Sequence, residues 1–313
     1  MLMEKKPMGS IAKLKEIGAR KVLLQFPEGL KTRALEIASR LQEAGITAYI
    51  SCDPCYGACD LKDSEAARLG CAALLHIGHT DFGVKAQLPV VYEEYPIEAD
   101  PIPFLENHIA SLKQYRKISL VTTLQFLSSL KPAKEYLGSK GIEVVISSPK
   151  VYAAKAGQIL GCDPTAALPD ASIDCILYIG SGMFHPLGVA IRTDKPVLSL
   201  DFETGELVDV QKEKIRIEKI RYASIEKARE ARNFGILVST KPGQLYFNAA
   251  DKMKEKLESI GKRAWIIVSD ELRPEKLLGM DLDVLVNCAC PRLREDTRLF
   301  RKPILNPEDV WKL

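Results

Sequence analysis

The sequence predicts an α/β fold built from three similar units, each with a mainly parallel β-sheet. One pattern occurs three times, at residues 19–50, 115–147 and 231–268: an apolar strand, a turn, an amphipathic helix, a glycine and a second strand. After each copy comes another apolar strand, followed by a proline and a short β-branched run. Strands that alternate with helices of this length form parallel sheets through βαβ crossovers.

The elements of the first unit follow in a regular order. Residues 19–50 read ARKVLLQFPEGLKTRALEIASRLQEAGITAYI, which gives a strand, a turn with Pro27 and Gly29, a helix, Gly45 and a second strand. A glycine just beyond the last helical turn supplies the left-handed backbone that ends a helix. A third strand is predicted at 71–80, CAALLHIGHT, and a fourth at 88–95, LPVVYEEY.

The second and third units repeat this order with nearly the same spacing. The first strand and the helix-ending glycine are 23 residues apart from Val22 to Gly45, 23 from Ile118 to Gly141 and 25 from Ile236 to Gly261. Their third strands are predicted at 174–182 and 283–291, and their fourth strands at 195–202 and 302–309. Chance alone rarely produces such agreement three times.

We therefore predict three domains of about 100 residues each, at residues 1–112, 113–228 and 229–313. The junctions fall near residues 106–117 and within the charged stretch 211–230, QKEKIRIEKIRYASIEKARE. That stretch could be a basic docking surface. We favour a solvated linker and helix face, which is the usual structure of a charge run.

The composition limits the possible functions. Of the 313 residues 46% are hydrophobic and 27% charged, and the net charge of +3 is too small to indicate a nucleic-acid partner. The N-terminal MLMEKKPMGS lacks the apolar run of a signal peptide, and no stretch has the length of a membrane span. We expect a cytoplasmic protein with no membrane contact. Its eight cysteines are then expected to be buried thiols or metal ligands rather than disulfides.

Three of the cysteines come from different units and follow predicted strands. Cys59 and Cys162 follow the second strands of units one and two, and Cys290 ends the third strand of unit three. Loops beyond the carboxyl ends of parallel strands collect the chemistry of such folds. If the units surround one axis, three thiolates can converge on a 4Fe-4S cluster and leave one iron open for a substrate. A structural zinc ion normally takes four ligands.

The other cysteines have alternative interpretations. Cys71 and Cys175 each begin an apolar strand, which predicts buried core positions. Cys52 and Cys55 form a C-x2-C-x3-C run with Cys59. That run either supplies a local metal cluster or is a tight turn containing Pro54 and Gly57, and we favour the turn. Cys288 competes with Cys290 as a ligand, because alternation along a strand points both the same way.

Several polar residues lie at the same predicted sheet edges. His76, His79 and His185 are either hydrogen-bonded scaffolding or functional groups. In STKPGQ, 239–244, backbone N–H groups and Lys241 follow a strand and are placed to hold a carboxylate. The spacing does not match a Walker A motif, which disfavours nucleoside triphosphate binding. Asp201 ends a strand, and is expected either to bind a ribose hydroxyl or ammonium group or to cap a helix.

Six motifs occur in this order across nearly the whole chain: YGACD (56–60), LHIGHT (75–80), LGCDP (160–164), YIGSGMFHPLG (178–188), FGILVSTKPGQ (234–244) and VNCACPR (286–292). They closely resemble those of the archaeal 2-(3-amino-3-carboxypropyl)histidine synthase family, which catalyses the first step of diphthamide biosynthesis. The resemblance implies a homodimer with three Rossmann-like domains around a 4Fe-4S cluster. By motif, the cluster ligands are Cys59, Cys162 and Cys290, which act catalytically through the cluster.

The resemblance also implies a radical reaction. An electron from a donor cleaves the bond between the sulfur and the γ-carbon of S-adenosylmethionine. The 3-amino-3-carboxypropyl group then passes to C2 of a histidine imidazole in elongation factor 2, and methylthioadenosine is released. Arg292 is also expected to tune the cluster potential through its charge. The residues expected to bind the cosubstrate are Ser181, Gly182, His185, Asp201, Lys241, Gly243, Gln244 and Arg292.

Two other functions fit parts of the pattern. Quinolinate synthase is similar in having three α/β repeats, three cysteines and one open iron, which it uses as a Lewis acid for dehydration. A non-catalytic iron-sulfur scaffold subunit is the alternative from outside the enzymes. The six motifs and the presence of all three cysteines in one chain favour the transferase.

Overall fold

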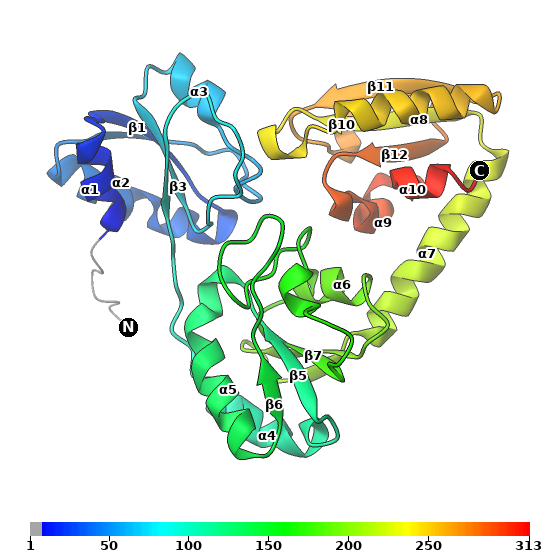
Figure 1. Ribbon diagram of the computed structural model, residues 1–313. Coiled ribbons are helices and arrows are strands. Elements are labelled where there is room, and N and C mark those ends of the chain that lie inside the picture. Colours follow the sequence, from blue (N-terminus) through cyan, green and yellow to red (C-terminus); the bar gives the residue numbers. More distant parts are fainter. Residues whose placement is uncertain (1–7) are drawn as a thin grey trace.

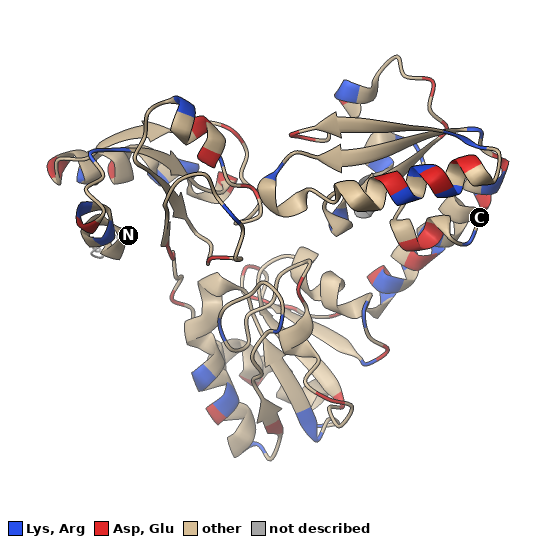
Figure 2. Cartoon of the chain, turned by 45° about the horizontal axis from the view of Figure 1, so that its top comes forward, with Lys and Arg blue, Asp and Glu red and all other residues tan. Residues whose placement is uncertain are grey.

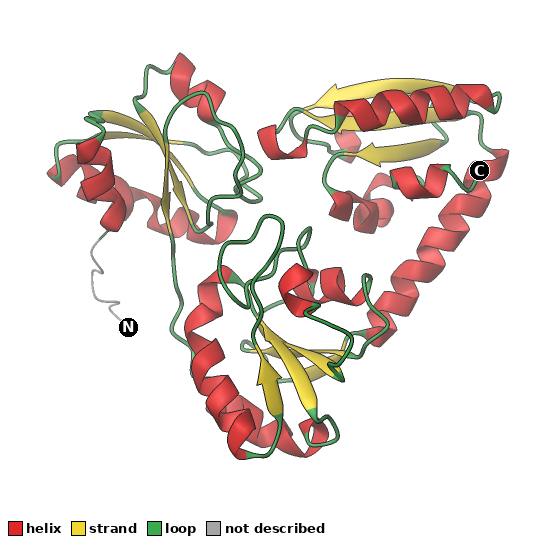
Figure 3. Ribbon diagram, in the orientation of Figure 1, coloured by secondary structure: helices red, strands yellow, loops and turns green. Residues whose placement is uncertain are grey.

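The computed structural model describes residues 8–313, and the side chains of all of these except residues 294–296. The described chain forms three lobes, each with its own β-sheet, arranged as a triangle with the sheets' loops facing the middle (Figures 1 and 3). The sheets have four, five and four strands. The predicted α/β fold with three repeated units is therefore confirmed.

The first lobe has a parallel sheet with the strand order β2-β1-β3-β4. Its strands are β1 (Lys21–Gln25), β2 (Thr47–Ile50), β3 (Ala73–Ile77) and β4 (Val90–Glu93). Its helices are α1 (Gly9–Glu16), η1 (Glu28–Arg33), α2 (Ala34–Glu43) and α3 (Asp63–Arg68).

The second lobe repeats this order as β6-β5-β7-β8 and adds β9, which pairs antiparallel with β8. Its strands are β5 (Lys117–Val121), β6 (Glu143–Val145), β7 (Cys175–Gly180), β8 (Val197–Asp201) and β9 (Leu207–Asp209). Its helices are α4 (Ile102–Leu112), η2 (Leu124–Ser129), α5 (Leu130–Ser139), η3 (Thr165–Ala167) and α6 (Phe184–Ala190).

The third lobe has the order β11-β10-β12-β13, again parallel. Its strands are β10 (Asn233–Ser239), β11 (Arg263–Ser269), β12 (Val284–Cys288) and β13 (Ile304–Leu305). Its helices are η4 (Pro242–Gln244), α8 (Phe247–Ser259), η5 (Pro274–Leu277), η6 (Pro291–Asp296), α9 (Thr297–Phe300) and α10 (Pro307–Val310).

As predicted, each of the three glycines of the repeat lies at the end of a helix. Gly45, Gly141 and Gly261 have φ angles of +80°, +85° and +77°. Glycine has no Cβ and adopts this left-handed backbone without strain. The chain therefore turns back at the same place in each lobe and enters the second strand of the sheet.

The inner strands of each sheet are buried on both faces. Every residue of β3, β7, β10 and β12 is buried, whereas the edge strand β2 alternates between exposed and half-buried residues. A parallel sheet covered by helices on both faces needs such continuous apolar strands. The predicted core positions of Cys71 and Cys175 are confirmed, with exposed fractions of 8% and 0%.

The packing of helix α4 indicates where the first domain ends. Leu105 and Leu112 of α4 pack into the core of the second lobe, together with Ile118 and Leu120 of β5. We therefore propose that the first domain ends before α4, rather than at residue 112. The division near residue 228 stays a prediction.

The charged stretch 211–230 forms one helix, α7 (Gln211–Glu230), which runs from the second lobe to the third (Figure 1). Ile217 of α7 packs in the second lobe, and Ile225 and Ala228 pack in the third. Helix α7 carries Lys, Arg and Glu residues along its length, and residues of both charge signs also lie along α8 (Figure 2). The predicted linker and helix face is confirmed for this stretch.

None of the described helices combines the length and the apolar character needed to cross a membrane.

Candidate functional site

The loops of all three lobes meet around one cavity of about 600 Å³. Direct hydrogen bonds between lobes surround it. The amide of Gln125 donates to the Gly78 carbonyl at 3.0 Å, and Tyr56 Oη donates to Glu271 at 2.8 Å. All three lobes thus contribute to the cavity walls, and contacts between the lobes determine the shape of the cavity.

Cys59, Cys162 and Cys290 all line this cavity, and all three also line a smaller one beside it. Cys59 lies in the loop after β2, Cys162 in the loop after β6, and Cys290 two residues beyond the end of β12. Each is half-buried and none forms a disulfide. The structure therefore brings together three thiols that are far apart in the sequence, as the repeat predicted.

Burial and neighbouring thiols raise the pKa values of Cys59 and Cys162. Burial raises the pKa of Cys162 to about 12, and the charges of Cys59 and Cys290 add to the shift. Burial also raises the pKa of Cys59, and the neighbouring Cys290 raises it further, while a hydrogen bond from Gln244 lowers it. Three thiolates could share this space only if a cationic group offset their repulsion.

The third lobe holds the Cys59 loop directly. Gly243 N–H donates to the Cys59 carbonyl at 2.8 Å, and Gln244 Nε2 donates to the Cys59 sulfur at 3.3 Å. A Cβ atom on Gly243 would lie 2.6 Å from both Cα and Cβ of Cys59. Glycine is thus required at position 243 because the backbone of the Cys59 loop passes against it.

Lys241 lies at the same interface, in a buried ion pair. Its Nζ is 2.9 Å from Asp60 Oδ1, and the two side chains are 6% and 1% exposed. Asp270 lies 3.6 Å from Lys241 and is also paired with Lys62 at 2.7 Å. Lys241 lines the cavity, but its charge is already neutralised within the protein. The role of Lys241 in holding a cosubstrate carboxylate stays a prediction, and we propose that its pair with Asp60 also positions the Cys59 loop.

Arg292 joins the third lobe to the second. Its guanidinium lies 3.9 Å from the centre of the Phe184 ring and donates a hydrogen bond to the Phe184 carbonyl. A Cβ atom would lie 3.0 Å from the guanidinium if placed on Gly161, and 2.7 Å if placed on Gly188. The glycines of the LGCDP and HPLG motifs therefore leave room for an arginine beside Cys290.

His185 lies on the cavity wall. Its ring stacks on Tyr178, with ring centres 6.3 Å apart and an angle of 15° between the planes. Burial lowers the pKa of His185 to about 4, and the Arg292 charge contributes to the shift. At neutral pH His185 is an uncharged imidazole, which can accept or donate one hydrogen bond.

Three of the predicted cosubstrate residues lie elsewhere. The described cavity walls do not include Ser181, Gly182 or Asp201. The Asp201 carboxylate instead accepts N–H bonds from Gly182, Glu203 and Thr204. It fastens the turns after β7 and β8 and caps none of the described helices. The helix-capping alternative is therefore wrong, and the ligand role stays a prediction.

The remaining cysteines do not reach the cavity. Cys288 is 2% exposed and packs in the core of the third lobe. Strand β12 ends at Cys288, so the expected alternation does not extend to Cys290, which turns toward the cavity. Cys52 is exposed and Cys55 buried, and the described walls contain neither. The C-x2-C-x3-C run therefore does not direct its three thiols at one point.

Sequence reasoning missed several residues of the cavity wall. Tyr152 and Tyr246 line the smaller cavity, and Thr123 and Phe184 the larger one. Tyr152, Thr123 and Phe184 follow strands β6, β5 and β7, and Tyr246 lies beyond β10. The rule that ligand sites form beyond strand carboxyl ends could have identified these loops, but not which side chains point inward.

The fold and the site define a class: a three-lobed α/β protein with one cysteine from each lobe at a shared cavity. The family model described as "Putative diphthamide synthesis protein" matches residues 26–311. The chain belongs to this diphthamide synthesis family.

Two named relatives and one solved structure are similar to this chain over nearly its whole length. The chain is 38% identical to the 2-(3-amino-3-carboxypropyl)histidine synthase of Pyrococcus horikoshii, over 97% of this chain and 89% of that protein. Subunit 1 of the synthase from Yarrowia lipolytica is 29% identical, over 96% of this chain and 70% of that protein. The crystal structure of Dph2 from Pyrococcus horikoshii with a 4Fe-4S cluster superposes with a TM-score of 0.90 at 37% identity, and the match covers 97% of this chain and 90% of that one.

Proposed function

We propose that this protein transfers the 3-amino-3-carboxypropyl group of S-adenosylmethionine to C2 of a histidine imidazole in elongation factor 2. This is the first step of diphthamide biosynthesis, and methylthioadenosine is the second product. The observation that carries the proposal is the convergence of Cys59, Cys162 and Cys290 on one cavity. It occurs in a chain that is similar throughout its length to a named synthase and to a structure containing a 4Fe-4S cluster.

The residues at the cavity fit such a cluster. Three thiols from separate lobes share one space without forming a disulfide, and burial raises the pKa values of Cys59 and Cys162. A bound cation would favour their thiolate forms. Thiolate sulfur is the protein ligand of iron-sulfur clusters, and three thiolates leave one iron without a protein ligand. When bound, the cluster supplies an electron and a coordination position for the cosubstrate.

The chain's own residues hold this arrangement in place. Gln244 directs an N–H at the Cys59 sulfur, and hydrogen bonds to a ligating sulfur adjust the potential of a cluster. The Lys241–Asp60 pair and Gly243 hold the Cys59 loop against the third lobe. Arg292 holds the chain beyond Cys290 against Phe184 of the second lobe.

The cosubstrate is expected to lie in the larger cavity. A volume of about 600 Å³ is within the range of small-molecule sites. His185 and Gln244 line it and can hydrogen-bond to the ribose, the amino-acid group or the adenine. Positioning by such contacts would select one of the three C–S bonds of the sulfonium for cleavage.

A homodimer, a separate electron donor and a cytoplasmic location belong to the same proposal. They are supported by the resemblance to the archaeal family. The proposal includes no nucleic-acid partner, in keeping with the net charge of +3.

The transfer is tested with the reconstituted protein, reductant, S-adenosylmethionine and archaeal elongation factor 2 under anaerobic conditions. Mass spectrometry of the digested factor should show one 3-amino-3-carboxypropyl group on a single histidine. A factor in which that histidine is replaced by glutamine is the control and should stay unmodified. An unmodified wild-type factor, despite cleavage of S-adenosylmethionine, would contradict the assigned acceptor.

A further inference from the structure

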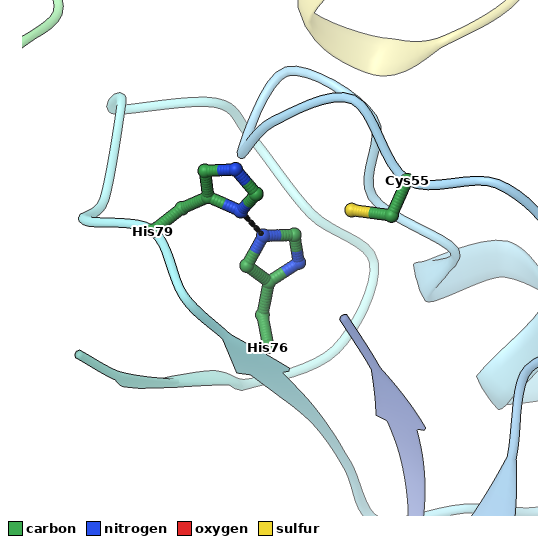
Figure 4. A group of neighbouring side chains, drawn as sticks. All are labelled: Cys55, His76 and His79. Carbon is green, nitrogen blue, oxygen red and sulfur yellow. Dashed lines mark hydrogen bonds between the residues drawn. The ribbon is translucent and has the colours of Figure 1, made fainter. Parts of the chain in front are cut away.

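Cys55, His76 and His79 form a second group of metal-binding side chains, within the first lobe. One ligand atom from each lies within 4.8 Å of the other two. Cys55 is 4% exposed and His76 is fully buried. Figure 4 shows the Cys55 sulfur directed toward the two imidazole rings, which come from the end of β3 and the residues just beyond it.

The hydrogen bonds around His76 fix which of its nitrogens is available. Gln25 donates its Nε2 to the Asp60 carbonyl at 2.6 Å, which turns its Oε1 toward His76 Nδ1 at 3.1 Å. Lys62 N–H also donates to Gln25 Oε1, at 3.3 Å. His76 must therefore carry its proton on Nδ1, and its Nε2 keeps a lone pair. A ligating histidine whose other nitrogen is held by a hydrogen bond in this way is typical of metal sites.

The two rings already stand at a separation that suits one ion. His76 Nε2 and His79 Nδ1 are 3.0 Å apart. A tetrahedral zinc ion with bonds of about 2.0–2.3 Å holds its nitrogen and sulfur ligands roughly 3.3–3.7 Å from one another. The nitrogens need to separate slightly, and the sulfur, which lies within 4.8 Å of them, needs to approach by up to roughly 1.3 Å. Both are side-chain movements.

We propose that Cys55, His76 and His79 bind a zinc-type divalent ion, a site separate from the three-cysteine site. Imidazole and thiolate together suit a borderline-soft ion such as Zn²⁺ better than Mg²⁺ or Ca²⁺. On binding, the His79 proton moves from Nδ1 to Nε2, and Cys55 releases its thiol proton to solvent.

Three protein ligands leave the fourth position of a tetrahedral ion open, as in catalytic rather than structural zinc sites. Gly78, His79 and Thr80 line the large cavity, so the group borders that cavity. A water molecule or a nitrogen or oxygen of a bound molecule would complete the coordination. This site and its contacts do not depend on the proposed transferase reaction.

The test uses the full-length chain with Cys59, Cys162 and Cys290 replaced by Ala, so that the first site cannot bind the probe. Anaerobic titration with Co²⁺ should give one ion per chain, with the visible bands of tetrahedral cobalt and a near-ultraviolet thiolate band. Added Zn²⁺ should abolish both. Cys55→Ser in this background should remove the thiolate band. His76→Asn should weaken binding by at least about tenfold.

Cys71→Ser is the matched control, because Cys71 is also buried in the first lobe but lies outside the group. It should bind cobalt like its parent. The proposal would be overturned if the protein is folded by circular dichroism but binds no cobalt. It would also be overturned if the thiolate band survives Cys55→Ser. If the variant lacking Cys59, Cys162 and Cys290 does not fold, the zinc content of wild type is compared with that of the single variants Cys55→Ser and Cys71→Ser. Cys55→Ser should then hold one zinc ion fewer than wild type, and Cys71→Ser the same number. Equal zinc contents in all three proteins would overturn the site.

Discussion

Lys241 Nζ lies 2.9 Å from Asp60 Oδ1, across the boundary between the third lobe and the first. Both side chains are almost completely buried, and Asp60 directly follows Cys59 in the chain. The ion pair therefore connects the position of one proposed cluster ligand to the packing of another lobe.

Lys241→Met should destabilise the protein and lower its capacity to hold iron. It leaves Asp60 buried without its partner, which typically costs about 3–5 kcal/mol. The free energy of unfolding and the iron content after reconstitution measure the two effects. Adding Asp60→Asn should recover part of the loss, because the unpaired charge is gone. Lys254→Met, at an exposed pair with Glu258 on α8, is the control and should behave like wild type. A normal iron content in the single variant Lys241→Met would refute the positioning role.

Gly243→Ala should displace the Cys59 loop. The added methyl group would lie 2.6 Å from backbone and side-chain atoms of Cys59, so the loop must move. We expect reduced iron content and an altered cluster absorption spectrum. Gly138→Ala is the matched control, since it lies in helix α5 with nothing within 4 Å of the new atom. That change should be neutral or stabilising by up to about 1 kcal/mol. Equal iron contents in the two variants would show that the Gly243 contact does not matter.

Single replacements should distinguish the cysteines that bind the cluster from a cysteine that only lies near it. Cys59→Ser, Cys162→Ser and Cys290→Ser should each lose most of the bound iron and the cleavage of S-adenosylmethionine. Cys288→Ser is expected to keep both, although burying a hydroxyl there costs about 1–3 kcal/mol. Iron analysis and electron paramagnetic resonance of the reduced protein provide the readout. If Cys288→Ser and Cys290→Ser lose iron equally, the assignment of Cys290 is wrong.

Stability should fall as the pH drops below about 6.5, the ordinary histidine pKa. Burial lowers the pKa of His79 and of His185 to about 4, so between these values the unfolded chain binds protons that the folded chain excludes. Each such histidine reduces the free energy of unfolding by at most about 1.4 kcal/mol per pH unit. Denaturant unfolding at pH 7 and pH 5 measures the slope. His185→Gln should make it shallower, and an unchanged slope would contradict neutral burial of His185.

Much of this architecture could be predicted from the sequence, because the features that specify it are local. The glycines Gly45, Gly141 and Gly261 mark a repeat, and residues after strand ends necessarily meet at one sheet edge. Cys59 and Cys162 were located on this basis.

What the sequence did not reveal depends on contacts between distant residues. Lys241 and Asp60 are 181 positions apart, and no local pattern pairs them. Asp201 has the residue type of a ligand, but its oxygens are used by backbone N–H groups that only the folded turns bring close. Leu105 and Leu112 show helix periodicity, yet only packing reveals that they belong to the second core.

The nucleoside formed from S-adenosylmethionine shows directly whether this protein is a 3-amino-3-carboxypropyl transferase. The protein is reconstituted anaerobically with iron and sulfide, then given reductant and S-adenosylmethionine, and the products are separated by liquid chromatography and identified by mass spectrometry. We expect wild type to form methylthioadenosine and Cys162→Ser to form none. Deoxyadenosine would show cleavage of a different C–S bond, and no cleavage by iron-loaded wild-type protein would contradict the transferase assignment.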